Sequence, residues 1–194
     1  WGSLTPGHPE FGHTAGVEMT TGPLGQGVAT AVGMAMAARY ERGLLDPGAP
    51  AGTSVFDHSI WVICSDGDLQ EGVSAEASSL AGTQELGALN LIYDDNRISI
   101  EGDTHNAFTE DVSARYRAYG WHVIDVAAAA NGSVDIAALD AAMVTAKKET
   151  TKPSLIRMKS VIAWPAPKAQ GTAGSHGSAL GDEEIAATKV ALGL

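Results

Sequence analysis

The sequence predicts an α/β fold in which a parallel β-sheet is covered by helices on both faces. Short apolar runs alternate along the chain with segments of helical character, and this alternation is typical of βαβ units. The first two runs, at residues 60–64 and 89–93, are nearly continuously apolar, whereas strands with one solvent-exposed face show alternation, so we expect these two strands to be buried on both faces. The four expected strands span residues 60–64, 89–93, 121–126 and 153–161.

The remaining elements follow from glycine, proline and small-residue patterns. Pro23 suits the first turn of a helix, and the glycines and alanines that follow it predict a helix packed close to its neighbours. Gly120 is expected to end a helix. We expect helices at residues 23–42, 71–86, 110–119, 134–148 and 182–192, and irregular segments at residues 1–16, 43–58, 97–109 and 164–181.

Composition limits the classes of function. The 194 residues suffice for one domain of ordinary size, and 12 basic against 23 acidic residues give a net charge of −11. Such a surface repels nucleic acid and anionic lipid, so we expect neither nucleic acid nor membrane as a partner. An anionic ligand would then have to be held by a metal ion, backbone N–H groups or histidine.

The single cysteine and the start of the chain also carry information. Cys64 excludes an internal disulfide framework and fits a cytoplasmic protein. No apolar run reaches transmembrane length. The chain begins at Trp1, without an initiator methionine and inside a segment rich in glycine, proline and histidine. We therefore expect a domain that is truncated at its N-terminus.

Two polar residues are expected at the carboxyl ends of neighbouring strands. Asp66 follows the first apolar run and Asn96 follows the second. Ligands of parallel sheets bind at these strand ends, and carboxylate and amide oxygens suit Mg²⁺ or Ca²⁺ that also holds a diphosphate. Gly67 would let the backbone approach that group, with a helix beginning near Leu69. The alternative is that Asp66 belongs to a simple turn and Asn96 to a loop.

Other motifs are weaker. The turn at residues 22–27 lacks the third glycine of a dinucleotide fingerprint. His8, His13 and His176 lie in glycine-rich loops, where most histidines are surface residues. His8 and His13 could ligate a metal ion, but no third nitrogen or sulfur ligand stands nearby, so zinc is not expected. Glu71 and Glu76 begin an expected helix, so a helix-capping role and a functional role are equally open.

A series of segments, in order along nearly the whole chain, strongly resembles transketolase. The segments are TPGHPE (5–10), GVEMTTGPLGQG (16–27), DGDLQEG (66–72), EASSLAG (76–82), YDDNRISI (93–100), YRAYGWH (116–122) and SHGSALG (175–181). The Asp66…Asn96 pair is similar to the thiamine diphosphate motif of that family, with Ser65 in place of its first glycine.

The resemblance implies roles for individual residues. Asp66, Asn96 and the carbonyl of Ile98 would bind the divalent cation, and Gly67 and Asn96 the diphosphate. The remaining implied roles are as follows: Gly22, Pro23 and Leu24 line the cofactor, His176 contacts the diphosphate and the substrate, His8 faces the thiazolium, and Glu71 and Glu76 lie near a dimer interface.

The implied activity is transfer of a two-carbon ketol unit between sugar phosphates in the pentose phosphate pathway, by a homodimer that uses thiamine diphosphate. The chain resembles only the later part of the family's first domain, so the pyrimidine-binding and C-terminal domains are expected to be absent and the isolated chain inactive. Two alternatives stay open: a non-catalytic cofactor-binding subunit of a split transketolase, and an enzyme of the dihydroxyacetone synthase type.

Overall fold

The centre of the fold is a four-stranded parallel sheet with the strand order β1-β2-β6-β5. The computed structural model describes residues 9–194, so His8 lies outside the described residues. The strands are β1 (Ile60–Ser65), β2 (Leu89–Asp95), β5 (His122–Val126) and β6 (Ser154–Lys159). The predicted parallel sheet is confirmed.

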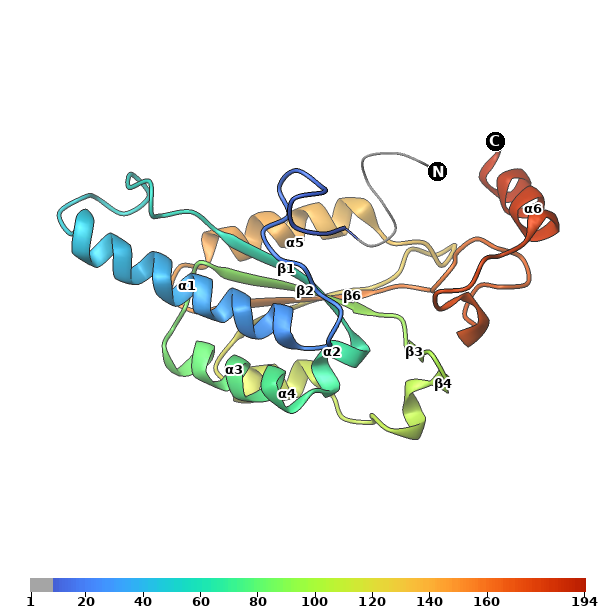
Figure 1. The fold of residues 1–194 in the computed structure, drawn as a ribbon, viewed down its shortest axis with the longest axis horizontal. Coiled ribbons are helices and arrows are strands. Elements are labelled where there is room, and N and C mark those ends of the chain that lie inside the picture. The colour runs from blue at the N-terminus through green and yellow to red at the C-terminus, as the bar shows by residue number, and fades with distance from the viewer. Residues whose placement is uncertain (1–8) are drawn as a thin grey trace.

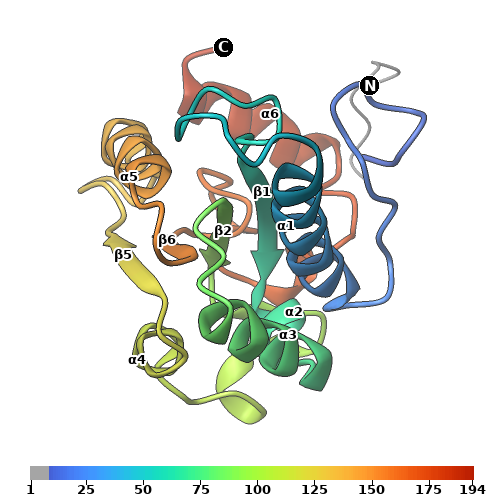
Figure 2. The ribbon, with the colours of Figure 1, turned by 90° about the vertical axis from the view of Figure 1, so that its left-hand side faces the viewer.

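Helices cover both faces of this sheet, as predicted (Figures 1 and 2). One face carries α1 (Gln26–Leu45), α3 (Gly72–Thr83) and α4 (Val112–Ala118), and the other carries α5 (Ile136–Lys148). The closing helix α6 (Asp182–Leu192) lies beyond the sheet, on the side of the carboxyl strand ends (Figure 1). Among the described residues, no helix combines the length and apolarity that a membrane span requires.

The strand β1 differs from its prediction. Its residues Ile60, Val62 and Cys64 turn toward the core beneath α1, but Trp61 is 37% and Ile63 78% exposed. The expectation of burial on both faces was therefore wrong for β1, while β2 is buried along nearly its whole length. The physical reason is position in the sheet: β1 is an edge strand, and α5 packs against β5 and β6 on that face.

Helix α1 begins three residues later than predicted, at Gln26, so Pro23 lies outside its first turn. Gly25 precedes the helix with a φ of 78°, a left-handed conformation that ends any helical path. The close packing of α1 is carried by its alanines and valines, which are buried at 28, 31, 32, 35 and 38. Gly33 faces open space, so close approach does not explain that glycine.

The segment after β1 is more helical than predicted. A five-residue helix, α2 (Asp66–Gln70), starts directly at Asp66, and α3 follows from Gly72 after the break at Glu71. The helix expected at 71–86 also ends earlier than predicted, at Thr83. Two residues later, Glu85 has a φ of 51°, which is incompatible with a continued helix.

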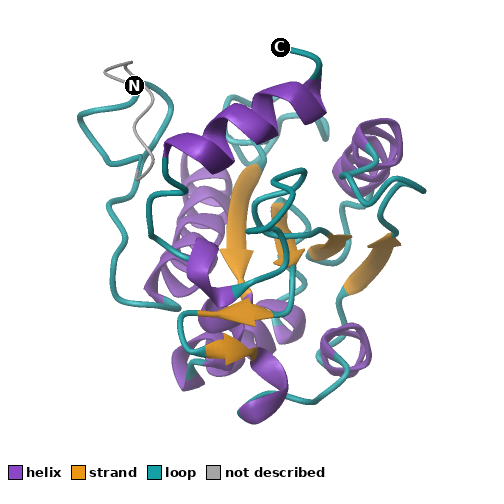
Figure 3. Ribbon diagram, turned by 90° about the vertical axis from the view of Figure 1, so that its right-hand side faces the viewer, coloured by secondary structure: helices purple, strands orange, loops and turns teal. Residues whose placement is uncertain are grey.

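The loops predicted at 97–109 and 164–181 contain short elements that the sequence pattern did not indicate. The first holds a two-stranded hairpin, β3 (Ile98–Ser99) and β4 (Gly102–Asp103), followed by η1 (Thr104–Asn106), and the second holds η2 (Ala173–Ser175). The view in Figure 3 faces the side of the molecule on which this hairpin lies, where the strands of the main sheet end.

Gly82 tests how tightly the helices pack. A Cβ at Gly82 would lie 1.8 Å from the backbone oxygen of Tyr119, whereas a Cβ at Gly72, in the same helix, would meet nothing within 4 Å. We expect Gly82→Ala to lower the free energy of unfolding by at least about 1–3 kcal/mol, because backbone must move. Gly72→Ala should leave it unchanged or slightly raised. Urea denaturation of both variants is the measurement, and equal midpoints would contradict the packing described.

Candidate metal and diphosphate site

The candidate site is built where β1 and β2 end side by side. These strands are paired in register, with Ser65 opposite Asp94, so the residues that follow them meet at one edge of the sheet. The backbone N–H of Arg97 donates a hydrogen bond of 3.1 Å to Oδ2 of Asp66. The structure therefore brings the Asp66 carboxylate next to the Asn96–Ile98 turn, although the two segments are some thirty positions apart in sequence.

The Asp66 carboxylate is nearly inaccessible, with 2% of the residue exposed. Its Oδ1 accepts a 2.5 Å hydrogen bond from the hydroxyl of Tyr93. Burial raises the pKa of Asp66, and the Tyr93 hydrogen bond opposes that rise. Burial, and then the same bond, raise the pKa of Tyr93, so the phenol stays neutral and donates. Asp66 is thus held in one orientation by a fixed neutral donor.

Arg97 adopts an unusual backbone conformation at the end of β2. Its φ is 64°, in the left-handed region, which is energetically unfavourable for any residue other than glycine. Its Nε donates to Oδ1 of Asp95 over 2.7 Å, and Asp95 is fully buried. Burial alone would raise the pKa of Asp95, but the hydrogen bonds from Arg157 and Arg97 outweigh it and lower that pKa. The ion pair with the buried Asp95 holds Arg97 in the geometry that aims its backbone N–H at Asp66.

Asn96 and Ile98 lie in the turn that follows β2, next to Asp66. The amide Nδ2 of Asn96 donates to Asp94 over 3.1 Å, and its Oδ1 accepts from the N–H of Ile98 over 2.9 Å. These bonds fix the amide, and each oxygen of Asp66 and Asn96 retains an acceptor lone pair. Such a set of hard oxygen donors fits a divalent cation that is also bound by phosphate oxygens.

The described residues contain no cluster of three or more His, Cys, Asp or Glu side chains suited to a metal ion. That finding is compatible with the predicted donors, because the predicted set draws on one carboxylate, one amide and a backbone carbonyl. A cation at this edge of the sheet would therefore depend on its ligand's oxygens to complete its coordination.

The glycine-containing turn at residues 22–27 lies against the start of α2. A Cβ built on Gly67 would come within 3.0 Å of the Leu24 side chain. A Cβ on Gly25 would come within 2.8 Å of both Glu71 and Ser74. The structure therefore places Leu24, one of the three residues predicted to line the cofactor, beside Gly67 at the strand end.

Sequence reasoning missed Asp68, which fastens this turn to α2. Its Oδ1 accepts from the N–H of Gly25 over 2.9 Å, and its Oδ2 accepts from both the N–H and the hydroxyl of Ser65. Ser65 and Asp68 form a capping box. The Ser-x-x-Asp spacing is a known sequence signal for such a box, but the bond to Gly25 has no local signal.

The remaining predicted site residues within the described part of the chain are exposed, and one of them, Glu71, lies against the glycine-containing turn. His176 directly follows η2 in the loop between β6 and α6 and is exposed. Glu71 and Glu76 are exposed at the start of α3, and Glu71 occupies the N-cap position without a side-chain cap hydrogen bond. Helix capping therefore does not account for Glu71.

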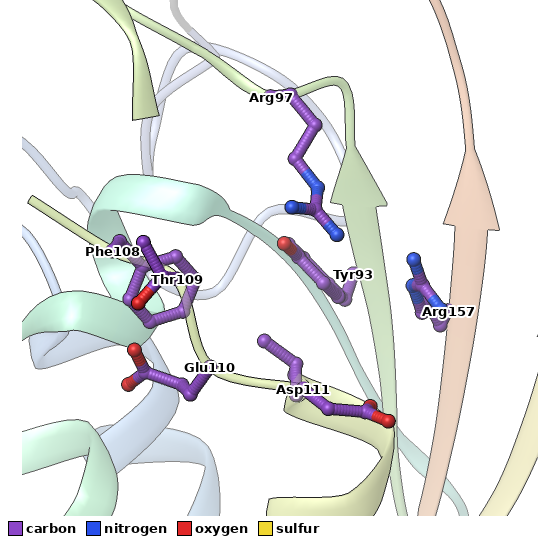
Figure 4. Close-up of a pocket in the computed structure, with 8 residues that line it drawn as sticks. Tyr93, Arg97, Phe108, Thr109, Glu110, Asp111 and Arg157 are labelled. Carbon is purple, nitrogen blue, oxygen red and sulfur yellow. The ribbon is translucent and has the colours of Figure 1, made fainter. Parts of the chain in front are cut away.

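A cavity of about 270 Å³ is lined by Tyr93, Arg97, Arg157 and residues 108–112 (Figure 4). Its charged lining residues are already engaged within the protein. Arg97 and Arg157 pair with Asp95, Glu110 pairs with Arg115, and Asp111 caps α4.

Burial raises the pKa of the Cys64 thiol, which excludes it as a ready nucleophile and agrees with its predicted packing role.

Fold and site together define an α/β domain of the thiamine diphosphate-binding class. Residues 1–194 match the family model described as "Transketolase, thiamine diphosphate binding domain". The chain belongs to this transketolase family.

Relatives support this assignment over the whole chain. It is 58% identical to the transketolase of Mycobacterium leprae (strain TN), covering 100% of this chain and 27% of that protein. It is 50% identical to the transketolase of Bacillus subtilis (strain 168), covering 98% and 28%. The chain thus spans little more than a quarter of the length of these relatives.

Solved structures share the fold. The Campylobacter jejuni transketolase superposes with a TM-score of 0.84 at 48% identity, covering 100% of this chain and 28% of that one. The Pichia stipitis transketolase, solved as a complex with sedoheptulose-7-phosphate, gives a TM-score of 0.84 at 47% identity with the same coverage.

We expect Asp68→Ala to loosen the glycine-containing turn, because it removes the acceptor of the Gly25 N–H and of Ser65. Leaving these donors unsatisfied should cost about 1–3 kcal/mol of unfolding free energy and raise hydrogen exchange at the Gly25 amide. Asp111→Ala is the matched control, since Asp111 accepts from the N–H of Ala114 at the start of α4. An unchanged Gly25 exchange rate in Asp68→Ala would show that the bond does not hold the turn.

Proposed function

We propose that this chain binds a divalent cation, Mg²⁺ or Ca²⁺, together with the diphosphate of thiamine diphosphate, and serves ketol transfer between sugar phosphates in a transketolase. The observation that carries the proposal is the hydrogen bond between the Arg97 N–H and Asp66. That contact joins the end of β1, which carries the buried Asp66 carboxylate, to the turn after β2, which carries the Asn96 amide.

Different residues bind the cation, the diphosphate and the rest of the cofactor. Asp66, Asn96 and the carbonyl of Ile98 hold the cation, and the N–H of Gly67 approaches the diphosphate. Gly22, Pro23 and Leu24 line the cofactor. This arrangement suits a chain with a net charge of −11, because a cation and backbone N–H groups can hold an anion without lysine.

Chemistry at the reacting carbon requires further groups. Bound thiamine diphosphate supplies the nucleophilic carbon and the electron sink for ketol transfer. His176, on its exposed loop, is proposed to contact the diphosphate and the substrate, and His8 to face the thiazolium. Hydrogen bonds from neutral or protonated imidazole suit the oxygens of a sugar phosphate. The Pichia stipitis transketolase, solved with sedoheptulose-7-phosphate, supports sugar phosphates as the substrate class.

A homodimer is proposed as the assembly. Glu71 and Glu76 lie exposed at the start of α3, and Glu71 has no capping bond that would explain it locally. Two carboxylates placed near a subunit interface could link the cofactor sites of two protomers through hydrogen bonds. We assign them to that interface.

Replacing Asp66 tests the cation site. We expect Asp66→Asn to weaken Mg²⁺-dependent binding of thiamine diphosphate by more than the ~10- to 100-fold seen when an outer-shell partner of a metal site is lost. Isothermal titration calorimetry with and without Mg²⁺ measures it. Asp140→Asn, which removes the same charge at an exposed position of α5, should bind like the wild type. Equal binding by Asp66→Asn would contradict the assignment.

A polypeptide of these 194 residues alone should not transfer ketol units. The expectation follows from length, since the chain covers 27% to 28% of the transketolases it matches. A coupled assay with a ketose phosphate and an aldose phosphate, at saturating thiamine diphosphate and Mg²⁺, is the measurement. A full-length transketolase is the positive control. Turnover by the purified chain, free of other protein, would refute the expectation.

A further inference from the structure

We infer that Tyr93 is a positioning residue whose hydroxyl fixes the Asp66 carboxylate in the orientation that binds the cation. The inference rests on the proposed function, because it concerns the same site. Tyr93 lies on β2 and is 1% exposed, and none of the sequence motifs assigned it a role in the site. Its effect on the reaction would pass through Asp66.

The single hydroxyl proton of Tyr93 has two carboxylates within reach. The oxygen lies 2.5 Å from Oδ1 of Asp66 and 3.4 Å from Oδ1 of Asp95. A phenol has one proton to donate, and 2.5 Å is the separation of a strong O–H···O⁻ bond. The proton therefore goes to Asp66, while Asp95 is satisfied by cations.

Asp66 is held from a second direction by the backbone of Arg97, which donates to Oδ2. The guanidinium of Arg97 is anchored on Asp95, which in turn pairs with Arg157 at 2.6 Å and Lys159 at 3.5 Å on β6. Each oxygen of Asp66 thus has one fixed donor, and residues of the neighbouring strands β2 and β6 hold these donors in place.

This arrangement has a direct consequence for metal binding. A carboxylate with one hydrogen bond on each oxygen cannot rotate about its Cβ–Cγ bond without breaking both. The lone pairs that remain are presented in one direction, so a cation finds its ligand already oriented. Groups that orient a metal ligand in this way typically contribute 10- to 100-fold to affinity. Without the hydroxyl, Asp66 keeps only the Arg97 bond and can turn.

The test compares two buried tyrosines. Tyr93→Phe removes the hydroxyl on Asp66, and Tyr116→Phe removes a hydroxyl that lies 3.0 Å from Ser78, in the same core cluster and at equal exposure. Affinity for thiamine diphosphate at fixed Mg²⁺ is measured by calorimetry, with thermal unfolding as a check of the fold. Hydrogen exchange of the Arg97 amide, measured without cofactor, reports independently on how firmly Asp66 is held.

We expect Tyr93→Phe to weaken Mg²⁺-dependent binding about 10-fold or more and to accelerate exchange at the Arg97 amide. Tyr116→Phe should lower the unfolding temperature about as much as Tyr93→Phe does. It should change neither the Mg²⁺-dependent binding nor the exchange of the Arg97 amide. Binding that depends on Asp66 but is the same in Tyr93→Phe and wild type would overturn this inference and leave the proposed function standing. A wild-type protein without any Mg²⁺-dependent binding would overturn both.

Discussion

The hydrogen bonds on the Asp66 carboxylate connect the ends of two strands that the rest of the fold keeps parallel and in register. One bond comes from Tyr93 within β2, and the other from the Arg97 turn that follows it. Both require that β1 and β2 be neighbours, and the paired register of the sheet provides this. The site is thus a consequence of strand order: in a different order, the same residues would lie at separate places along the sheet edge.

The buried charge of Asp95 explains how a chain with a large excess of acids stabilises this edge. Asp95 is fully buried, and Arg97, Arg157 and Lys159 surround it. A buried carboxylate without such partners would be costly. The same contacts constrain the left-handed Arg97, so these basic side chains stabilise the backbone geometry of the site rather than bind a ligand. In the proposed function, a bound cation would then be the counterion of the anionic cofactor.

Glycine is required at Gly25 and Gly82 for different reasons, whereas no contact requires it at Gly33. At Gly25 the left-handed φ and the nearby side chains of Glu71 and Ser74 both demand it, because a Cβ would displace the turn from α3. At Gly82 a Cβ would collide with the backbone before β5. Gly33, in contrast, faces open space on α1. Glycine in a helix therefore indicates close packing only where a neighbouring element supplies the contact.

Much of the local structure could be predicted from the sequence. The alternation of apolar runs and helical segments predicted the parallel sheet, and the bounds of α6 agree with their prediction. The short elements within 97–109 could not be predicted, because residues 98–99 and 102–103 form strands only by pairing with each other. The start of α1 was displaced because Gly25 is held by Asp68, more than forty residues away.

The sequence by itself determined which residues stand at the strand ends, because Asp66 and Asn96 directly follow apolar runs whose character is local. It also determined the family, through segments whose residue types and order are preserved along the chain. Only the tertiary structure decided which groups hold those residues. Tyr93 reads as one more apolar strand residue, and its role exists because β2 lies beside β1. The exposure of Ile63 was decided in the same way, by which helix covers which strand, a relation that no local pattern encodes.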